Sequence, residues 1–173
     1  MPDDLFAVAI SGSPRAPSKS RRLAERALSE LESFGCRTQL IDIAVLPADA
    51  LVVRAESSAV TEAVEAVGRA HIVVAASPTY RALYTGVLKC FFDLMPQEHL
   101  AGKVCVGLQT GIAPQHALSA EYGFRPLFAS LEGLPLSVTY ALDSDFADGE
   151  PSGELMARLS VALRGAVNSA RAG

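Results

Sequence analysis

Hydrophobic positions along the chain change repeatedly between continuous runs and a helical spacing. Residues 5–10 read Leu-Phe-Ala-Val-Ala-Ile, and residues 72–76 read Ile-Val-Val-Ala-Ala. Continuous apolar runs of this length are typical of strands buried on both faces of a parallel sheet. After the first run, Leu23, Ala27 and Leu31 recur at four-residue intervals, which predicts an amphipathic helix.

The same alternation continues along the chain. Five strands are expected, at residues 5–10, 37–43, 72–76, 103–109 and 136–142. Five helices are expected, at residues 20–34, 58–69, 86–95, 115–132 and 152–170. Gly123 and Pro126 are expected to interrupt the fourth helix, because neither residue favours a helix interior. Residues 44–54 are interpreted as an irregular connection.

Strands that alternate with helices indicate a doubly wound parallel sheet. We expect one α/β domain over residues 1–173, a flavodoxin-like three-layer sandwich with a five-stranded parallel sheet of order 2-1-3-4-5. In such sheets ligands bind beyond the carboxyl ends of the strands, at the switch point between strands 1 and 3. Polar, glycine-containing loops follow strands 1, 3 and 4, so all three are expected to surround one site.

Composition narrows the class of protein. Half of the 173 residues are hydrophobic and a fifth are charged, which suits one globular domain with a sizeable core. The net charge of -4 and the scattered arginines give no basis for nucleic-acid binding. No apolar run approaches the roughly 18 residues of a membrane helix, and the acidic N-terminus lacks the basic segment of a signal peptide. We therefore expect a soluble, cytoplasmic protein without a membrane partner.

Cysteine and histidine usage gives no sign of a metal site. Cys36, Cys90 and Cys105 are far apart, without a CxxC pair, and the three histidines do not pair with Cys or carboxylates at metal-ligand spacing. We expect buried free thiols, which fits a reducing compartment.

The loop after the first strand is rich in hydroxyl donors. Residues 11–20 read Ser-Gly-Ser-Pro-Arg-Ala-Pro-Ser-Lys-Ser and lead into a helix N-terminus. Free backbone N–H groups and the helix dipole favour an anion there, and Arg15 supplies a fork that matches phosphate. The spacing is neither that of a Walker A loop nor that of the GxGxxG fingerprint. The loop favours a terminal monophosphate, with a capped, solvated turn as the alternative.

The loops after strands 3 and 4 are less specific alone. Residues 77–86 read Ser-Pro-Thr-Tyr-Arg-Ala-Leu-Tyr-Thr-Gly, in which Pro78 stiffens the turn and two tyrosines offer flat surfaces. A flavin ring needs such contacts together with backbone donors. In the third loop, Thr110-Gly111, a glycine lets backbone approach a ligand closely. The alternative is a turn whose aromatic side chains cover a helix end.

Taken together, these motifs resemble the NAD(P)H-dependent FMN reductase family, and within it the flavin reductases of bacterial alkanesulfonate monooxygenase systems. The resemblance rests on Ser-Gly-Ser-Pro-Arg, on Pro-Thr-Tyr-Arg before Tyr-Thr-Gly-Val-Leu-Lys, and on Thr-Gly, and it runs from the first strand to about Leu131. The three motifs follow each other in the family's order, on the expected loops.

The resemblance implies FMN and NADPH (or NADH) as cofactors. It assigns the FMN phosphate to the first loop, at Ser11, Ser13, Arg15, Ser18 and Ser20. It places the isoalloxazine ring against Pro78, Thr79, Tyr80 and Arg81, with Thr110 and Gly111 near its pyrimidine side.

The resemblance also implies an assembly. The family forms homodimers and homotetramers, and residues 121–126 resemble a segment in which the sulfonate-linked reductases carry an interfacial tyrosine in a π-helical insertion. Tyr122 occupies that position, which implies a role in assembly or in releasing reduced flavin to a flavin-dependent monooxygenase partner. The alternative is a kinked helix with a packed tyrosine.

The expected activity is hydride transfer from the nicotinamide to FMN, for which no acid–base pair is assigned. Two alternatives stay open. One is a reductase that retains FMN and reduces quinones, azo dyes or metal ions. The other is a flavodoxin-type electron carrier, although the absence of Trp and the modest charge count against it.

Overall fold

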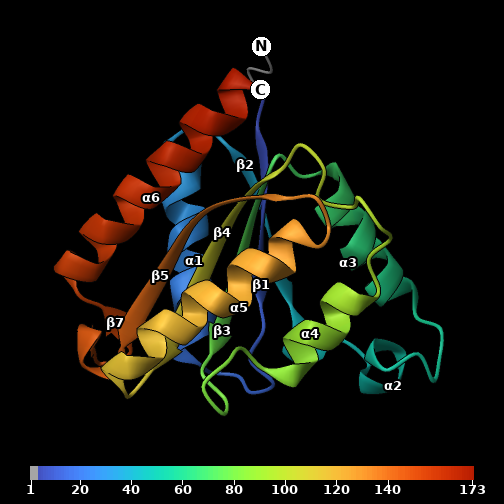
Figure 1. The fold of residues 1–173 in the computed structure, drawn as a ribbon, viewed down its shortest axis with the longest axis horizontal. Coiled ribbons are helices and arrows are strands. Elements are labelled where there is room, and N and C mark those ends of the chain that lie inside the picture. Colours follow the sequence, from blue (N-terminus) through green and yellow to red (C-terminus); the bar gives the residue numbers. More distant parts are fainter. Residues whose placement is uncertain (1–3) are drawn as a thin grey trace.

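A computed structural model describes residues 4–173 as a five-stranded sheet covered by helices on both faces (Figure 1). The sheet consists of β1 (Phe6–Ser11), β2 (Arg37–Asp42), β3 (Ile72–Pro78), β4 (Val104–Gly111) and β5 (Leu134–Leu142). Every neighbouring pair is parallel, in the order β2-β1-β3-β4-β5. The fold class and strand order expected from the sequence are therefore confirmed.

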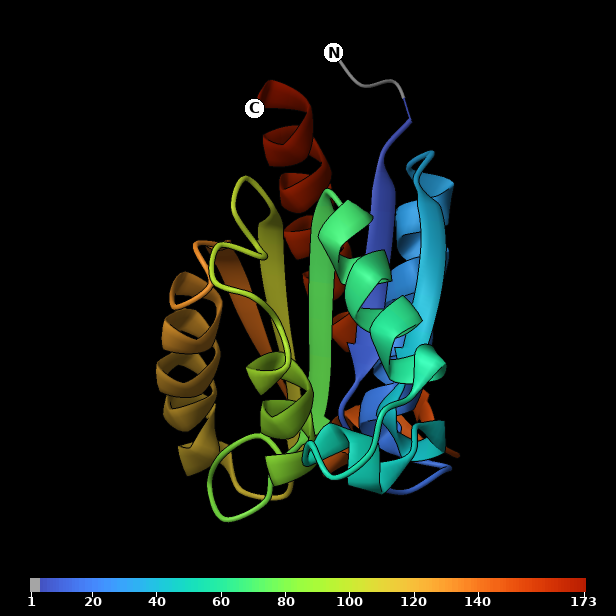
Figure 2. The same ribbon diagram turned by 90° about the vertical axis from the view of Figure 1, so that its right-hand side faces the viewer.

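The helices form the two outer layers. They are α1 (Lys19–Ser33), α2 (Ala48–Leu51), α3 (Ser58–Arg69), α4 (Gly86–Asp93), α5 (Ala117–Ala129) and α6 (Gly153–Ala172). Helices α1 and α6 cover one face, while α3, α4 and α5 cover the other (Figures 1 and 2). No helix within residues 4–173 is long and apolar enough to cross a membrane.

Each face has its own apolar cluster. Between the sheet and α1 and α6 the buried side chains are mainly Leu, Ala and Val, which let the helices approach closely. The opposite face is aromatic, with Phe124 and Phe128 stacked at 5.6 Å between ring centroids. Fully burying side chains of this size contributes roughly 1.5–3 kcal/mol each. The central strands β1, β3 and β4 lie between both clusters, which explains their continuous apolar sequence.

The expected interruption of the fourth helix is wrong, because α5 runs from Ala117 to Ala129 as an unbroken α-helix without a π-helical segment. Its pattern of burial explains why. Phe124 and Phe128 are buried on one side, whereas Pro126 lies on the exposed side. The backbone hydrogen bond that Pro126 cannot donate would go to Tyr122, which is also exposed, so water can replace it.

Two connections hold elements that were not expected. Between β2 and α3 lie the 3₁₀ turn η1 (Ile43–Val45) and the short helix α2. After β5 come the 3₁₀ turn η3 (Asp143–Asp145) and a small antiparallel hairpin of β6 (Phe146–Ala147) and β7 (Glu150–Pro151). Asp148 and Gly149 both have positive φ (51° and 81°), which a two-residue turn of type I′ requires.

Candidate functional site

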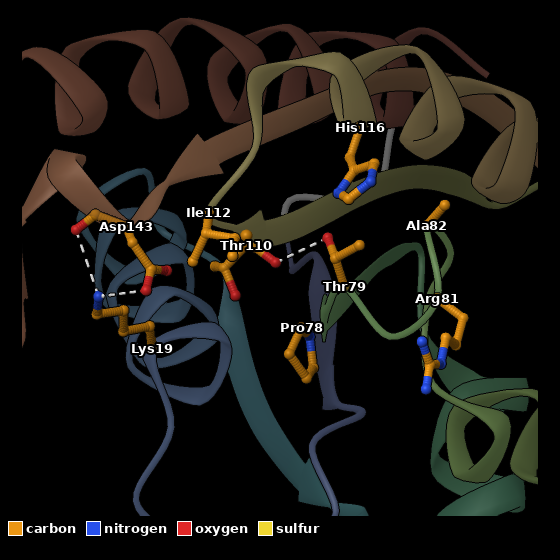
Figure 3. Close-up of a pocket in the computed structure, with 10 residues that line it drawn as sticks. Lys19, Pro78, Thr79, Arg81, Ala82, Thr110, Ile112, His116 and Asp143 are labelled. Carbon is orange, nitrogen blue, oxygen red and sulfur yellow. Dashed lines mark hydrogen bonds and ion pairs between the residues drawn. The ribbon is translucent and has the colours of Figure 1, made fainter.

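The carboxyl ends of the strands lie together at one edge of the sheet, at the opposite end of the molecule from the C-terminus of α6 (Figures 1 and 2). The loops after β3 and β4 line a cavity of about 740 Å³ there, which we call the central cavity. Its lining residues are Lys19, Pro78, Thr79, Arg81, Ala82, Thr110, Gly111, Ile112, His116 and Asp143 (Figure 3). A parallel sheet of this order was expected to place a site here.

The first loop joins β1 to the N-terminus of α1. Ser18 caps the helix, because its Oγ accepts the backbone N–H of Arg21 at 3.1 Å, and it lies 3.3 Å from the Oγ of Ser20. The first turn of α1 holds no acidic residue. The positive end of the helix dipole is therefore available to an anion.

Two other residues of this loop differ in how free they are to bind a ligand. The Ser13 hydroxyl already bonds the backbone of Arg15, donating to its carbonyl at 2.8 Å and accepting its N–H at 3.1 Å. Ser13 therefore fixes the shape of the turn. The guanidinium of Arg15 is exposed and forms no ion pair with any residue from 4 to 173, so it is free to pair with an anion.

The second loop is tied to the third by backbone and side-chain bonds. The N–H and the hydroxyl of Thr79 both donate to the Thr110 carbonyl, at 2.7 and 2.9 Å. The amide Nε2 of the buried Gln109 donates to the Thr79 Oγ1 at 2.9 Å. These bonds hold the two cavity walls at a fixed separation before any ligand is bound.

The tip of the second loop is a tight hairpin turn. Tyr80 and Leu83 exchange backbone hydrogen bonds of 2.8 and 3.2 Å, and the central residues Arg81 and Ala82 have φ of 52° and 68°. Neither central residue is glycine, so the turn carries backbone strain. The strained turn presents Arg81 to the cavity, without an ion pair to any described residue.

Position 111 requires glycine, because two neighbouring side chains lie too close for a Cβ. A Cβ at this position would lie 2.3 Å from the Tyr140 hydroxyl and 2.8 Å from Thr79 Oγ1. The Tyr140 hydroxyl in turn donates to the Ala113 carbonyl at 2.9 Å. The glycine thus lets the third loop pass between two side chains that hold the cavity wall, a stricter role than the ligand approach expected from the sequence.

The structure brings together five of the predicted site residues in the central cavity, namely Pro78, Thr79, Arg81, Thr110 and Gly111. Ser18 lines an adjoining cavity of about 530 Å³, which shares Lys19 with the first. The hydroxyl-bearing residues Ser11, Ser13 and Ser20 of the first loop are buried. Arg15, Tyr80 and Tyr122 line neither cavity.

Tyr122 is 73% exposed on the outer side of α5. Its neighbour Gly123 presses against the second loop, where an added Cβ would lie 2.6 Å from the Leu83 side chain and 3.2 Å from the Tyr84 ring. The tyrosine is thus not a packed core residue, and the helix that carries it is in direct contact with the loop that lines the central cavity.

Five lining residues were not among the predicted site residues, namely Lys19, Ala82, Ile112, His116 and Asp143, and three of these carry polar side chains. Lys19 Nζ lies 3.0 Å from Asp143 Oδ2, so an ion pair closes one end of the cavity. Lys19 stands within the first-loop motif and could have been chosen from it. No local motif pointed to Asp143, because it reaches the site only by its position directly after β5. His116 had been considered near the site but not assigned to it.

The polar atoms of this edge fit a ligand rich in donors and acceptors. Ser11 Oγ, Gln109 Oε1 and His116 Nδ1 are buried and have no hydrogen-bond partner within residues 4–173. Buried polar atoms are normally paired, so unpaired ones indicate a partner that the chain does not supply. No group of three His, Cys, Asp or Glu within the described chain could hold a metal ion.

Comparison with known proteins agrees with this geometry. The family described as NADPH-dependent FMN reductase matches residues 7–147. The chain is 33% identical to the FMN reductase (NADPH) of Escherichia coli K12, over 82% of this chain and 75% of that protein. It is also 33% identical to the NADH-dependent FMN reductase SfnE of Pseudomonas putida, over 96% of this chain and 93% of that protein.

Solved structures extend the comparison. The apo form of the NADH:FMN oxidoreductase EmoB matches with a TM-score of 0.86 at 33% identity, over 95% of this chain and 89% of that chain. A flavodoxin from Streptococcus pneumoniae matches with a TM-score of 0.66 at 13% identity, over 95% of this chain and 98% of that chain, which shows a shared fold.

Proposed function

The chain belongs to the NADPH-dependent FMN reductase family, and from that premise we propose that its central cavity is where FMN is bound and reduced. The protein is an NAD(P)H:FMN oxidoreductase that uses FMN and NADPH or NADH. The observation that supports the site is the convergence of the loops after β3 and β4 on one cavity, beside the N-terminus of α1, whose first turn holds no acidic residue.

The residues divide by the part of FMN that they suit. Arg15, Ser18 and the N–H groups at the start of α1 would bind the phosphate, as charge-assisted donors. Pro78 and Thr79 would contact the isoalloxazine ring, with Thr110 and Gly111 along its polar side. The Ser11 hydroxyl, which has no hydrogen-bond partner within residues 4–173, lies at the end of β1 where the first loop begins, and it would bond the ribityl chain.

The protein's contribution to the reaction is placement. FMN supplies the hydride-accepting chemistry, with the reduced nicotinamide as donor. The bonds from Thr79 and Gln109 hold the cavity walls so that two flat rings can stack at reacting distance. The walls exclude water from one side of that stack, and no side chain is required to transfer a proton.

Arg15→Ala tests the phosphate assignment. Losing a charge-assisted bond set costs about 1.5–3 kcal/mol, so we expect the Kd for FMN to rise by roughly 10- to 150-fold. Fluorescence quenching of FMN measures the Kd. The matched control is Arg54→Ala, since Arg54 is also exposed but does not belong to the first loop. An unchanged Kd in Arg15→Ala would remove the assignment.

We further infer that reduced FMN leaves the enzyme and serves a flavin-dependent monooxygenase. Ile112 lines the central cavity while 79% exposed, so the cavity is open to solvent within the described chain. NAD(P)H oxidation that saturates with added FMN, by protein that loses its flavin on gel filtration, would support release. Flavin that stays bound through gel filtration would instead indicate a reductase that retains FMN.

Assembly and location are also proposals. We infer a homodimer or homotetramer through the exposed side of α5, where Leu118 and Tyr122 are largely uncovered apolar side chains. Tyr122→Ala should leave the circular dichroism spectrum unchanged but alter the sedimentation coefficient or the flavin retained. Val161→Ala on α6 is an equally exposed control. A wild-type sedimentation coefficient together with wild-type flavin retention would contradict the role of Tyr122.

The free thiols of Cys36, Cys90 and Cys105 support a cytoplasmic location.

A further inference from the structure

The imidazole of His116 reaches into the central cavity from above the second and third loops (Figure 3). His116 ends the 3₁₀ turn η2 (Pro114–His116) and immediately precedes α5. Its Nδ1 atom is buried and has no hydrogen-bond partner within residues 4–173. Its side chain makes no capping bond to the helix that follows.

The backbone that carries this imidazole is held on both sides. On one side the Tyr140 hydroxyl donates to the Ala113 carbonyl at 2.9 Å. On the other, the Ser119 hydroxyl donates to the carbonyl of His116 itself at 2.7 Å. The backbone from which the ring extends is therefore held in place by the fold.

A buried polar atom without a hydrogen-bond partner destabilises the folded protein. A ligand that completes the hydrogen bond of His116 would remove this destabilisation, because the ring nitrogens can donate or accept. The other polar groups of the cavity are engaged differently. Lys19 is paired with Asp143, Thr79 bonds Thr110, and Arg81 sits at an exposed turn.

We propose that His116 hydrogen-bonds the polar edge of the isoalloxazine ring and binds the reduced ring more strongly than the oxidised ring. This inference rests on the proposed function of the same cavity. Reduction places negative charge on the pyrimidine half of the ring, the half that the resemblance assigns to Thr110 and Gly111. A hydrogen-bond donor gains strength when its acceptor becomes charged. His116 thus sets the ratio of the affinities for the two redox forms.

A difference in affinity is also a difference in reduction potential. If the site loses tenfold in affinity for reduced FMN relative to oxidised FMN, the potential of bound FMN falls by about 30 mV for a two-electron couple. Two independent measurements therefore report the same quantity, and neither depends on turnover.

The experiment compares the wild type with His116→Leu, which removes both ring nitrogens, and with His116→Gln, which restores a donor. The Kd is measured anaerobically for oxidised FMN and for chemically reduced FMN, and the potential of bound FMN by equilibration with a reference dye. For His116→Leu we expect a loss about tenfold larger for reduced FMN than for oxidised FMN, and a potential about 30 mV lower. His116→Gln should recover most of both effects.

Gln115→Leu is the matched control, because Gln115 is the exposed neighbour of His116 and lines neither cavity. If His116→Leu unfolds, His116→Ala is measured against the same expectation. Equal changes in both Kd values, or none, would overturn the role of His116. Failure of the proposed function looks different, since the wild type itself would then show no saturable FMN binding.

Discussion

At the scale of single residues, Cys105 shows how burial controls chemistry in this protein. Its thiol is fully enclosed, with only the Lys103 carbonyl at 3.7 Å as a polar contact. Burial raises the pKa of Cys105 from 9.0 to about 12, because the thiolate cannot be solvated there. Burial also raises the pKa of Cys36. Both thiols are therefore unreactive in the folded state.

The raised pKa of Cys105 predicts a loss of stability at alkaline pH. Above pH 9 the unfolded chain releases the thiol proton while the folded chain keeps it, so the free energy of unfolding falls as pH rises. The slope from this group approaches about 1.4 kcal/mol per pH unit until the folded thiol also ionises. Urea unfolding at several pH values from about 8 to 10 measures the slope.

Cys105→Ala should flatten that slope, whatever its effect on stability at neutral pH. Val106→Ala, which truncates a buried side chain of the same strand without a titratable group, is the control and should keep the wild-type slope. Equal slopes in Cys105→Ala and the wild type would contradict the assignment.

The residues of the site were predictable where a loop motif carries them. Pro78, Thr79 and Thr110 follow apolar strands directly, so the sheet order alone brings them together. Asp143 reaches Lys19 across 124 sequence positions. No local pattern reports such a contact, because it depends on where β5 ends and which way η3 turns.

At the scale of elements, the position of α5 depends on two glycines, one on β4 that faces α5 and one on α5 that faces the second loop. A Cβ at Gly107 of β4 would lie 2.7 Å from Cγ of Phe124, and Gly123 makes the corresponding contact with the second loop. Local propensity predicted a broken helix here. Burial of Phe124, Leu127 and Phe128 outweighs the cost of Gly and Pro, and that burial cannot be seen in the helix's own sequence.

Gly107→Ala should destabilise the protein by about 1–3 kcal/mol, since overfilling a packed core has that cost. Phe124 cannot move aside, because it is fully buried and stacked on Phe128. Thermal unfolding gives the change. Gly86→Ala is the control: a Cβ there meets nothing within 4 Å, so the helix start should be unaffected or more stable. A Gly107→Ala protein as stable as the wild type would show that α5 is free to shift.

At the scale of the whole molecule, the β6–β7 hairpin is fastened to α1 by charge. Glu150 pairs with Arg26 at 2.9 Å and with Arg22 at 3.1 Å, while Lys19 holds Asp143 at the hairpin's base. The hydrogen bond from Arg26, with the charge of Arg22, lowers the pKa of Glu150. The helix that follows the first loop, α1, thus also anchors the hairpin beside it.

Glu150→Gln should loosen this hairpin without unfolding the sheet. Hydrogen exchange of residues 146–151 is expected to speed up in the variant. In the wild type it should speed up when salt screens the pairs, or when pH falls through the lowered pKa of Glu150 and its charge is lost. Glu62→Gln, at an exposed residue of α3, is the control. Unchanged exchange in Glu150→Gln would show that the hairpin is held by Phe146 packing instead.

The loops after β1, β3 and β4 are joined to one another by hydrogen bonds. Gly12 donates its N–H to the Ala76 carbonyl at 2.7 Å, Thr85 donates its hydroxyl to the Gly12 carbonyl, and Thr79 bonds Thr110. A preformed pocket needs little rearrangement, so the association rate constant is set by encounter and orientation. Substitutions in these loops should therefore change the dissociation rate constant of FMN more than its association rate constant. Natural selection could adjust how long the flavin stays bound through that dissociation rate constant.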